Sequence, residues 1–319
     1  MKKSSRPLKI IFFGTPDFAV EPLKAVTDAG YEIAAVITNP DKPAGRGRKI
    51  RMSDVKKFAL ERGLPVLQPE NLADPDFVNY IKRLEPDVGI VVAFKKIPEV
   101  IWRIPPHGIF NIHASLLPDY RGAAPIHHVI INGEKETGIT TFFINDRIDT
   151  GEIIWQKPVP VEESDTYGTL YEKLKIPAAE AALETLKLIE TGKVDPIPQN
   201  SSSARHKAPK LTKHNTRINW NDSPLKIHRL VKGLSPRPAA RTVYDDGKGE
   251  KTMKIFKTSY TEEKHAYAPG EAFIEGKRLK IAVPGGFVFP LEVRPENKRR
   301  MSVLDFINGL KSGDKLIFK

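Results

Sequence analysis

The sequence predicts an α/β protein, with a doubly wound and mostly parallel sheet followed by a smaller, basic β-barrel domain. Apolar, β-branched runs alternate with helix-length segments through residues 8–160 of the 319-residue chain. Beyond residue 210 the pattern changes to short alternating runs, and the excess positive charge lies in this region. Dividing the length by about 150 residues per domain also gives two domains.

Six apolar runs are expected to form the strands of the first domain. They begin at Lys9, Ile33, Pro65, Asp87, Gly108 and Gly138. Continuous apolar strands separated by helix-length segments indicate a parallel sheet that is covered on both faces. Such sheets bind ligands at the carboxyl ends of their strands, so we expect a site just after Phe13, Val92 and Phe110.

The first domain is expected to end in a long helix between Asp165 and Ile189, which Pro177 should bend. Residues 192–209 then combine Gly, Pro and a triple Ser without apolar periodicity, which is typical of a linker. The sequence therefore predicts a first domain over residues 1–191, a linker over residues 192–209 and a second domain over residues 210–319.

The second domain is expected to open with a helix and to continue as strands. Ile227, Leu230, Val231 and Leu234 follow the spacing of one helical face. Residues 279–283 and 287–293 alternate in polarity on either side of Pro284-Gly285-Gly286, which predicts a hairpin with one buried face. Short strands in a basic module of this size fit a small barrel, of which the OB-fold is one nucleic-acid-binding example.

Composition excludes several classes of protein. The chain has no cysteine, which rules out a disulfide framework, a thiolate nucleophile and a Cys-ligated metal. There is no run of 18 apolar residues, and the first apolar run contains Lys9 and stops at Gly14. We therefore expect no signal peptide and no membrane-spanning helix. The absence of cysteine favours a reducing compartment, so we predict a cytoplasmic protein. We also predict a monomer.

The net charge of +12 belongs to one region of the chain. Residues 1–200 hold 26 basic and 27 acidic residues, whereas residues 201–319 hold 25 basic and 12 acidic residues. A basic surface confined to one region is the electrostatic signature of a polyanionic partner, with nucleic acid first and a membrane surface second. A basic domain that is merely well solvated remains the alternative.

The densest group of residues that could do chemistry lies in residues 110–133 and 145–154. Asn111 and His113 are two residues apart, so on a strand their side chains share a face. Asp149 follows in a loop after the next predicted strand, where it could close over them. A donor, a titratable base and a carboxylate together suit attack on a carbonyl carbon, although each residue alone is more commonly structural.

The motifs around these residues resemble the 10-formyltetrahydrofolate-dependent formyltransferases, a family with a Rossmann-like catalytic domain. The central resemblance lies in Asn111-x-His113, in residues 115–118 (SLLP) and 121–126 (RGAAPI), and in Asp149-Thr150-Gly151. Further matches to the members that act on a charged tRNA are residues 13–19, 40–48, 208–213 and 298–302. The matched motifs span both predicted domains. The chain departs from the family pattern at Lys95, Asp119 and Arg147.

The resemblance implies a transferase that moves a formyl group from 10-formyltetrahydrofolate to the α-amino group of methionine on initiator tRNA, for translation initiation. It implies that Asn111 holds the formyl oxygen, that His113 handles protons and that Asp149 sets the charge of His113. Folate is expected along Ser115, Leu116, Leu117 and Pro118 and near the loop after Val92. No metal is predicted, since His127 and His128 are adjacent and on a helix would point about 100° apart.

Residues 41–57 hold seven basic residues, two acidic residues and two glycines, ahead of a helix that Ser53 is expected to cap. A solvated, flexible loop is one interpretation of this composition. The resemblance instead implies a loop that enters the acceptor end of the tRNA, with Arg46 central and Arg48 and Lys49 beside it. Lys210 and Lys213 lead a set of C-terminal cations expected to contact phosphates.

Other functions explain less of the sequence. A dinucleotide-dependent oxidoreductase would need G-x-G-x-x-G spacing, which residues 14–19 lack. A serine hydrolase using Ser115 would lack a G-x-S-x-G elbow. A non-catalytic RNA-binding protein would leave Asn111, His113 and Asp149 without a role. A formyltransferase acting on glycinamide ribonucleotide would not need the basic second domain, and one acting on amino sugars would not need the loop around Arg46.

Overall fold

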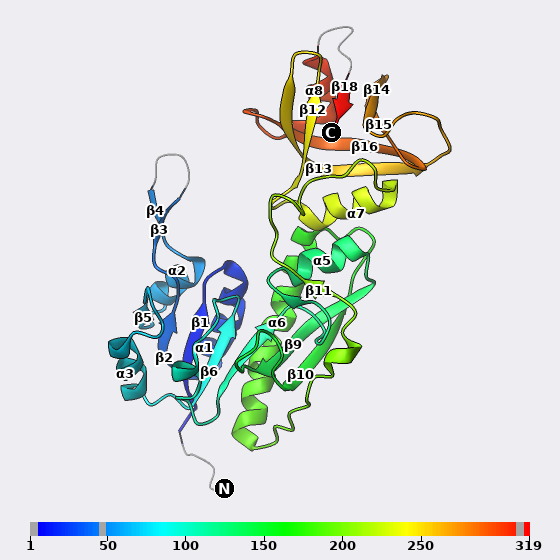
Figure 1. Cartoon of the computed structure of the whole chain (residues 1–319). Coiled ribbons are helices and arrows are strands. Elements are labelled where there is room, and N and C mark those ends of the chain that lie inside the picture. Colours follow the sequence, from blue (N-terminus) through cyan, green and yellow to red (C-terminus); the bar gives the residue numbers. More distant parts are fainter. Residues whose placement is uncertain (1–5, 45–48, 311–315) are drawn as a thin grey trace. The chain divides into compact units, whose positions relative to one another are not determined.

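The computed structural model describes residues 6–44, 49–310 and 316–319 (Figure 1). The chain divides into two compact units, each assembled from separate segments. The first unit holds the residues up to Gly122 together with Glu136–Pro160 and Tyr171–Lys207. The second unit holds Ala123–Lys135, Val161–Leu170 and Ala208–Lys319. The domain limits expected from the sequence stay a prediction.

A seven-stranded sheet forms the centre of the first unit, with the strand order β10-β9-β7-β6-β1-β2-β5. The five strands from β7 to β5 run parallel, and β9 and β10 are antiparallel to their neighbours. The strands are β1 (Lys9–Gly14), β2 (Glu32–Ile37), β5 (Val66–Leu67), β6 (Val88–Val92), β7 (Ile109–His113), β9 (Glu136–Phe143) and β10 (Ile153–Pro160). The predicted mostly parallel sheet is confirmed.

Strand β10 is the one strand of this sheet that the sequence pattern does not indicate. Most of its side chains are partly exposed or exposed, Val159 alone among them is buried, and the strand contains Pro158 and Pro160. Proline is tolerated at a sheet edge because one side of the edge strand needs no ladder hydrogen bonds. The position of β10 at the end of the sheet therefore explains why its sequence does not resemble that of the buried strands.

Buried side chains cover both faces of the central strand β1. Ile11 and Phe13 pack with Ile81 and Ile101 of helices α3 and α4 in one buried cluster. Ile10 and Phe12 point to the opposite face and are equally buried, which is the expected arrangement for a doubly wound sheet. The helices of this unit are α1 (Val20–Asp28), α2 (Asp54–Glu61), α3 (Pro75–Arg83) and α4 (Glu99–Trp102), with 3₁₀ turns η1 (Asp17–Ala19) and η2 (Ser201–Ser203).

Two sequence predictions about helices are confirmed. The Ser53 side chain accepts a hydrogen bond from Lys56 N at 3.0 Å and so caps α2. The long helix predicted between Asp165 and Ile189 is α6 (Tyr167–Thr191), a 25-residue helix that contains Pro177. Within the first unit, two residues of α6 hydrogen-bond to Asp17 of η1. Tyr171 Oη donates to Asp17 Oδ1 at 2.6 Å, and Lys175 Nζ donates to Asp17 Oδ2 at 2.8 Å.

The second unit contains a closed antiparallel barrel of six strands (Figure 1). Its strands follow the order β13-β12-β18-β14-β15-β16, and pairing of β16 with β13 closes the barrel. The strands are β12 (Ala240–Asp245), β13 (Glu250–Glu262), β14 (Glu271–Glu275), β15 (Arg278–Val283), β16 (Gly286–Pro295) and β18 (Leu316–Phe318), with β17 (Met301–Ser302) beside β16. The barrel prediction is confirmed, as is the hairpin, which is β15 and β16.

Helices complete the second unit, and they are α5 (Pro125–Asn132), α7 (Pro224–Leu234) and α8 (Val303–Asn308). Helix α7 is the helix predicted from Ile227 to Leu234, and its buried face joins the barrel core. That core includes Trp220, Ile255 and Val293, each almost fully buried. The barrel therefore closes around mainly apolar side chains, and the buried hydroxyl of Thr242 accepts a hydrogen bond from Trp220 Nε1 at 2.8 Å.

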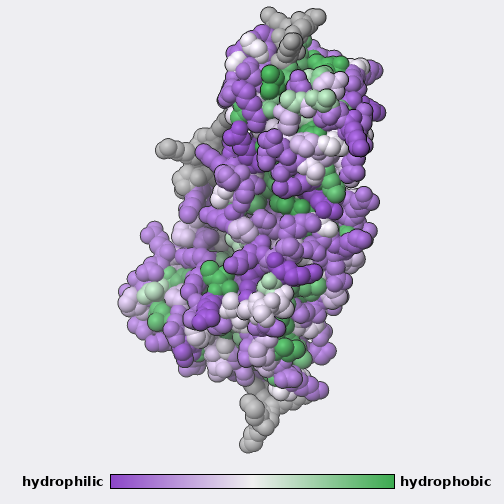
Figure 2. All heavy atoms as spheres, turned by 45° about the vertical axis from the view of Figure 1, so that its right-hand side comes forward, coloured by the Kyte–Doolittle hydropathy of each residue, from purple (hydrophilic) through white to green (hydrophobic). Residues whose placement is uncertain are grey.

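Hydrophilic residues cover most of the face seen in Figure 2, and hydrophobic residues form separate patches on it. Within the part of the chain that the structure describes, no helix is both long and apolar enough to cross a membrane.

Replacing Ile255 with alanine should destabilise the barrel by about 2–5 kcal/mol, because a fully buried side chain is lost and a cavity remains. Ile274→Ala is the matched control, since Ile274 lies on β14 of the same barrel and is 44% exposed. The urea midpoint followed by tryptophan fluorescence measures both variants. Equal midpoints for the two would contradict the assignment of Ile255 to the core.

Candidate active site

Strand β7 places Asn111 and His113 near the carboxyl end of the sheet. Asn111 is paired in register with Val91 of β6 and Phe142 of β9, and His113 with Thr140 of β9. The side chain of Asn111 is half-buried, whereas His113 is 7% exposed. Because the two residues are two positions apart on a strand, their side chains share a face, as the sequence predicts.

The backbone fixes the tautomer of His113. Its Nε2 lies 3.0 Å from the carbonyl oxygen of Tyr120, and a carbonyl can only accept, so Nε2 carries the hydrogen. The other ring nitrogen, Nδ1, lies 3.9 Å from Oδ2 of Asp149. That distance allows charge interaction but is longer than a direct hydrogen bond. His113 Nδ1 is therefore the ring atom at which a proton can be exchanged next to a carboxylate.

Asp149 is held in place by a hydrogen bond from the backbone of another loop. Gly122 N donates to Asp149 Oδ2 at 2.8 Å, and the Asp149 side chain is 12% exposed. The residue has a φ of 54°, a left-handed conformation that is uncommon for non-glycine residues and tolerated best by Asp and Asn. The structure thus brings Asn111, His113 and Asp149 into one region, although 36 residues separate the last two in sequence.

Gln199 is a further contributor that the sequence pattern does not indicate, since it lies in the predicted linker. Its amide nitrogen donates to the carbonyl oxygens of Asp149 and Gly151, at 3.1 Å and 2.7 Å. Its amide oxygen accepts from the guanidinium of Arg121 at 2.6 Å and 3.0 Å. A glutamine in a Pro- and Ser-rich segment gives no periodic signal, so only the structure identifies this contact.

Gly151 has no room for a side chain. A Cβ atom built there would lie 1.6 Å from the carbonyl oxygen of Phe143. On the same loop, Asn145 Oδ1 accepts from Arg147 N at 2.9 Å and from Thr150 Oγ1 at 3.1 Å. The loop between β9 and β10 is therefore tightly wound, and this winding sets where Asp149 points.

The predicted folate segment, residues 115–118, is anchored by its own polar groups. Ser115 is fully buried, and its Oγ donates to the carbonyl oxygen of Asp119 at 2.7 Å. Leu117 N donates to Thr140 Oγ1 at 3.1 Å, and Gln156 donates to Leu117 O at 2.9 Å. Leu117 is buried, whereas Leu116 and Pro118 are half-buried. The segment therefore offers apolar surface at Leu116 and Pro118.

Asp119, a departure from the family pattern, has a clear partner. Its carboxylate accepts hydrogen bonds from Arg205, through backbone N at 2.6 Å and Nη2 at 2.9 Å, and from His206 N at 3.2 Å. Burial favours the neutral acid, but these hydrogen bonds and the Arg205 charge hold the pKa of Asp119 below its ordinary value. The neighbouring Tyr120 ring stacks on His206, with ring centroids 5.4 Å apart.

The basic loop predicted over residues 41–57 is only partly described. Residues Lys42–Ala44 (β3) and Lys49–Arg51 (β4) form a two-stranded antiparallel ribbon. Its base is anchored, because Lys56 Nζ donates to Asp41 Oδ2 at 2.5 Å and to Gln68 Oε1 at 2.6 Å. The Lys56 hydrogen bond holds the pKa of Asp41 below its ordinary value. Arg46 and Arg48 lie outside the described residues.

The remaining predicted tRNA-binding residues are described only in part. Lys49 belongs to β4, and only its backbone is described. Lys210 and Lys213 are exposed and follow the two-residue strand β11 (Lys207–Ala208). Strand β11 pairs with another two-residue strand, β8 (Arg121–Gly122).

The adjacent histidines lie on α5 in the second unit. His127 stacks on Tyr167 at 3.6 Å and its Nδ1 donates to Gly233 O at 2.8 Å. Burial lowers the pKa of His127 to about 4. His128 Nε2 donates to Pro209 O at 3.0 Å. Among residues 6–44, 49–310 and 316–319, no group of three or more His, Cys, Asp or Glu residues is arranged to hold a metal ion.

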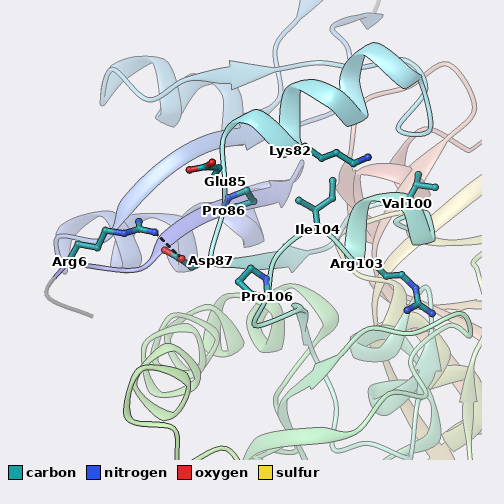
Figure 3. A pocket seen from close by; sticks show the side chains of 9 residues that line it. All are labelled: Arg6, Lys82, Glu85, Pro86, Asp87, Val100, Arg103, Ile104 and Pro106. Atoms are coloured by element: carbon teal, nitrogen blue, oxygen red, sulfur yellow. Dashed lines mark hydrogen bonds and ion pairs between the residues drawn. The ribbon is translucent and has the colours of Figure 1, made fainter. Parts of the chain in front are cut away.

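A hollow lies at the opposite end of the strands from His113, where the central strand β6 begins (Figure 3). Arg6 and Asp87 form an ion pair at its wall, with Arg6 Nη2 3.1 Å from Asp87 Oδ1. Asp87 also accepts from Lys9 N at 2.7 Å, so this pair anchors the start of β1. The hollow lies at the amino ends of the strands and contributes nothing to the site around His113. Its lining residues are Arg6, Lys82, Glu85, Pro86, Asp87, Val100, Arg103, Ile104 and Pro106.

Comparison with known proteins covers nearly the whole chain. Residues 8–186 match the model of the formyl transferase family, and residues 210–311 match the formyl transferase C-terminal domain. The methionyl-tRNA formyltransferase of Bacteroides thetaiotaomicron is 44% identical over 319 residues, which cover 98% of each chain. That of Thermodesulfovibrio yellowstonii is also 44% identical, with 95% of this chain and 96% of that protein covered.

Solved structures of low sequence identity share the fold, and one example matches over most of both chains. It is an N-formyltransferase from Helicobacter canadensis in complex with folinic acid and dTDP-3-aminofucose, and it matches with a TM-score of 0.65 and 22% identity. The match covers 89% of this chain and 98% of that one.

Replacing Gly151 with alanine should lower turnover by about 100-fold, because the new methyl group would displace the loop that carries Asp149. Gly309→Ala is the control, since a Cβ there would meet nothing nearer than 3.4 Å. Steady-state turnover of both variants is the measurement. Unchanged turnover in Gly151→Ala would contradict the role of the loop.

Proposed function

The chain belongs to the formyl transferase family, and we propose that it transfers the formyl group of 10-formyltetrahydrofolate to the α-amino group of the methionyl moiety of initiator Met-tRNA. The product is N-formylmethionyl-tRNA, the substrate for translation initiation. The observation that carries this proposal is the convergence of Asn111, His113 and Asp149 at the carboxyl end of the sheet.

The amide of Asn111 is proposed to hold the formyl oxygen. Among the described residues, no hydrogen-bond partner of this half-buried amide is found, so its N–H groups remain available to a substrate. An amide N–H that is fixed on a central strand needs no reorganisation when negative charge develops on the oxygen. Asn111 therefore acts as the oxyanion donor of this proposal.

His113 is proposed to manage protons through Nδ1, since Nε2 is occupied by the Tyr120 carbonyl. A free α-amino group has a pKa of about 7.7–8.0, so near neutral pH it needs only modest help to become a nucleophile. As the amine nitrogen bonds to the formyl carbon, His113 Nδ1 accepts its proton and Asp149, 3.9 Å away, stabilises the imidazolium. His113 then returns this proton to the folate nitrogen, so that the bond between the formyl carbon and that nitrogen breaks, tetrahydrofolate leaves and His113 is neutral again.

The folate co-substrate is proposed to lie along residues 115–118. The half-buried Leu116 and Pro118 suit a planar, partly apolar ring, and the hydrogen bonds of Ser115 and Leu117 hold the segment in shape. The environment of Ser115 argues against a serine hydrolase. Ser115 is fully buried, and its hydroxyl donates to the carbonyl oxygen of Asp119, so it is not placed to act as a nucleophile.

Met-tRNA is proposed as the partner of the basic regions. The charge excess beyond residue 200, the barrel, and the exposed Lys210 and Lys213 support contacts with phosphates. We propose that Arg46, Arg48 and Lys49 contact the acceptor end of the tRNA and so select the initiator. In this proposal residues 1–191 are catalytic, residues 192–209 link, residues 210–319 bind tRNA, and the protein acts as a cytoplasmic monomer without a metal.

The proposal is tested by formyl transfer from 10-formyltetrahydrofolate to initiator Met-tRNA, elongator Met-tRNA and a small amine. We expect transfer to initiator Met-tRNA in preference to the other two acceptors. Asn111→Ala and His113→Ala should each lower turnover by about 100-fold or more, because an oxyanion donor or a proton acceptor is lost.

His107→Ala is the control for His113→Ala, since His107 is exposed at the other end of β7. Transfer to the small amine alone would refute the assigned acceptor. Near-wild-type turnover of either site variant would remove that residue from the mechanism.

A further inference from the structure

One short turn supplies a backbone partner to both titratable residues of the candidate site. The Tyr120 carbonyl oxygen accepts from His113 Nε2 at 3.0 Å. Two residues later in the chain, Gly122 N donates to Asp149 Oδ2 at 2.8 Å. We name residues 119–122 the support turn. Because both contacts come from this turn, a displacement of the turn would disturb His113 and Asp149 together.

The backbone of Tyr120 is in a conformation that the support turn does not favour by itself. Its φ of 61° lies in the left-handed region, where a bulky residue is a rare exception. Tyr120 is also buried, with 4% of its surface exposed. Such backbone conformations persist only where surrounding contacts impose them, and they are concentrated at functional sites. The support turn therefore needs partners from another part of the chain.

The carboxylate of Asp119 joins the support turn to residues 205 and 206. Its Oδ1 accepts from Arg205 N at 2.6 Å and from His206 N at 3.2 Å. Its Oδ2 accepts from the Arg205 guanidinium, at 3.1 Å from Nε and 2.9 Å from Nη2. The Asp119 side chain is 16% exposed, so water competes only weakly for these hydrogen bonds. Both carboxylate oxygens are thus used to hold the turn.

Further contacts fix the support turn on either side of this carboxylate. Tyr120 N donates to His206 O at 2.9 Å, and the rings of the same two residues stack. The Ser115 hydroxyl donates to Asp119 O at 2.7 Å. Arg205 and His206 lie in the segment predicted as a linker, and through Asp119 they support the two residues proposed to do the chemistry.

We propose that Asp119 is a positioning residue for the transfer reaction, an inference that rests on the proposed function. Asp119 fixes the support turn on residues 205 and 206, and the turn holds the Tyr120 carbonyl at His113 Nε2. With the hydrogen on Nε2, Nδ1 has a free lone pair that accepts the proton of the attacking amine. Asp119 is a departure from the family pattern, so the resemblance assigns it no role.

Loss of the Tyr120 contact would change which ring nitrogen of His113 carries the hydrogen. Nε2 would lose its acceptor, whereas Nδ1 lies 3.9 Å from the Asp149 carboxylate. A hydrogen on Nδ1 would be attracted to that carboxylate, and the neutral ring could then accept no proton at Nδ1. The tautomer of His113 therefore reports directly on the support turn.

Asp87 is a matched control at the amino end of the strands. Its carboxylate accepts from Lys9 N at 2.7 Å and from Arg6 Nη2 at 3.1 Å, and its side chain is 20% exposed. Asp87 thus has the same kinds of partner as Asp119, a backbone N–H and an arginine, at nearly the same exposure. Its loss removes comparable hydrogen bonds but leaves those of the support turn in place.

The test compares Asp119→Ala, Asp119→Asn and Asp87→Ala in the full-length protein. Asn keeps an oxygen that can accept from Arg205 N and His206 N, whereas Ala keeps no acceptor. We expect Asp119→Ala to lower kcat for formyl transfer to initiator Met-tRNA by about tenfold or more, with KM for the tRNA within about twofold of wild type. Asp119→Asn should stay within about threefold of the wild-type kcat, and Asp87→Ala within about twofold.

Nitrogen NMR chemical shifts of the imidazole rings at neutral pH provide a measurement that a purely structural role would leave unchanged. The His113 signals are identified by their absence from the spectrum of His113→Gln. We expect the hydrogen on Nε2 in the wild-type protein, Asp119→Asn and Asp87→Ala, and a shift toward Nδ1 in Asp119→Ala. Thermal unfolding gives the folded fraction of each variant, so that kcat refers to folded protein.

The outcomes separate this proposal from the proposed function. Wild-type kcat in folded Asp119→Ala, or a loss of kcat without a change of the His113 tautomer, would overturn the role of Asp119. Equal losses in Asp119→Asn and Asp119→Ala would overturn the assignment to the backbone hydrogen bonds. Absence of formyl transfer by the wild-type protein, with the tautomer change intact, would refute the proposed function alone.

Asp119→Glu keeps the test decisive if Asp119→Ala does not fold. It retains the charge but displaces the carboxylate by one methylene group, so the support turn should move with it. We then expect the same loss of kcat and the same shift of the His113 tautomer. A folded Asp119→Glu protein with wild-type kcat and the hydrogen on Nε2 would contradict the proposal.

Discussion

The hydrogen bond from Gly122 N to the Asp149 carboxylate is the contact on which the candidate site depends. It joins the loop after β9 to the segment that follows β7, and so it brings together residues from distant parts of the sequence. Asp149 reaches this position only because its backbone is left-handed and because Gly151 leaves room for the Phe143 carbonyl. Gln199 then fixes the loop from a third segment.

The sheet and the barrel could be predicted because their patterns are local. Four of the five parallel strands, β1, β2, β6 and β7, are largely apolar and buried, and burial on both faces of the sheet favours that composition. The β15–β16 hairpin follows from alternation around Pro284-Gly285-Gly286. Strand β10 could not be predicted. As an edge strand with prolines and exposed side chains, it shows neither a continuous apolar run nor an alternation of apolar and polar residues. Closure of the barrel depends on the pairing of β13 with β16, which no local pattern encodes.

Residue chemistry and family resemblance predicted which residues form the site, but not the contacts that hold them in place. The pairing of Asn111 with His113 follows from strand periodicity, but the choice of Nδ1 as the proton-exchanging atom requires the Tyr120 carbonyl. The contacts of Gln199, and those of Asp119 with Arg205 and His206, join segments about 50 to 87 residues apart.

The proposed mechanism requires the negative charge of Asp149 beside His113, in addition to the hydrogen bond by which Asp149 holds the loop. Asn at this position keeps an oxygen that can accept from Gly122 N but removes the charge. The most direct measurement is the single-turnover rate of formyl transfer to Met-tRNA by Asp149→Asn, beside its thermal unfolding midpoint. We expect a rate about 100-fold below that of the wild-type protein, with an almost unchanged unfolding midpoint. A near-wild-type rate in a folded Asp149→Asn protein would contradict it.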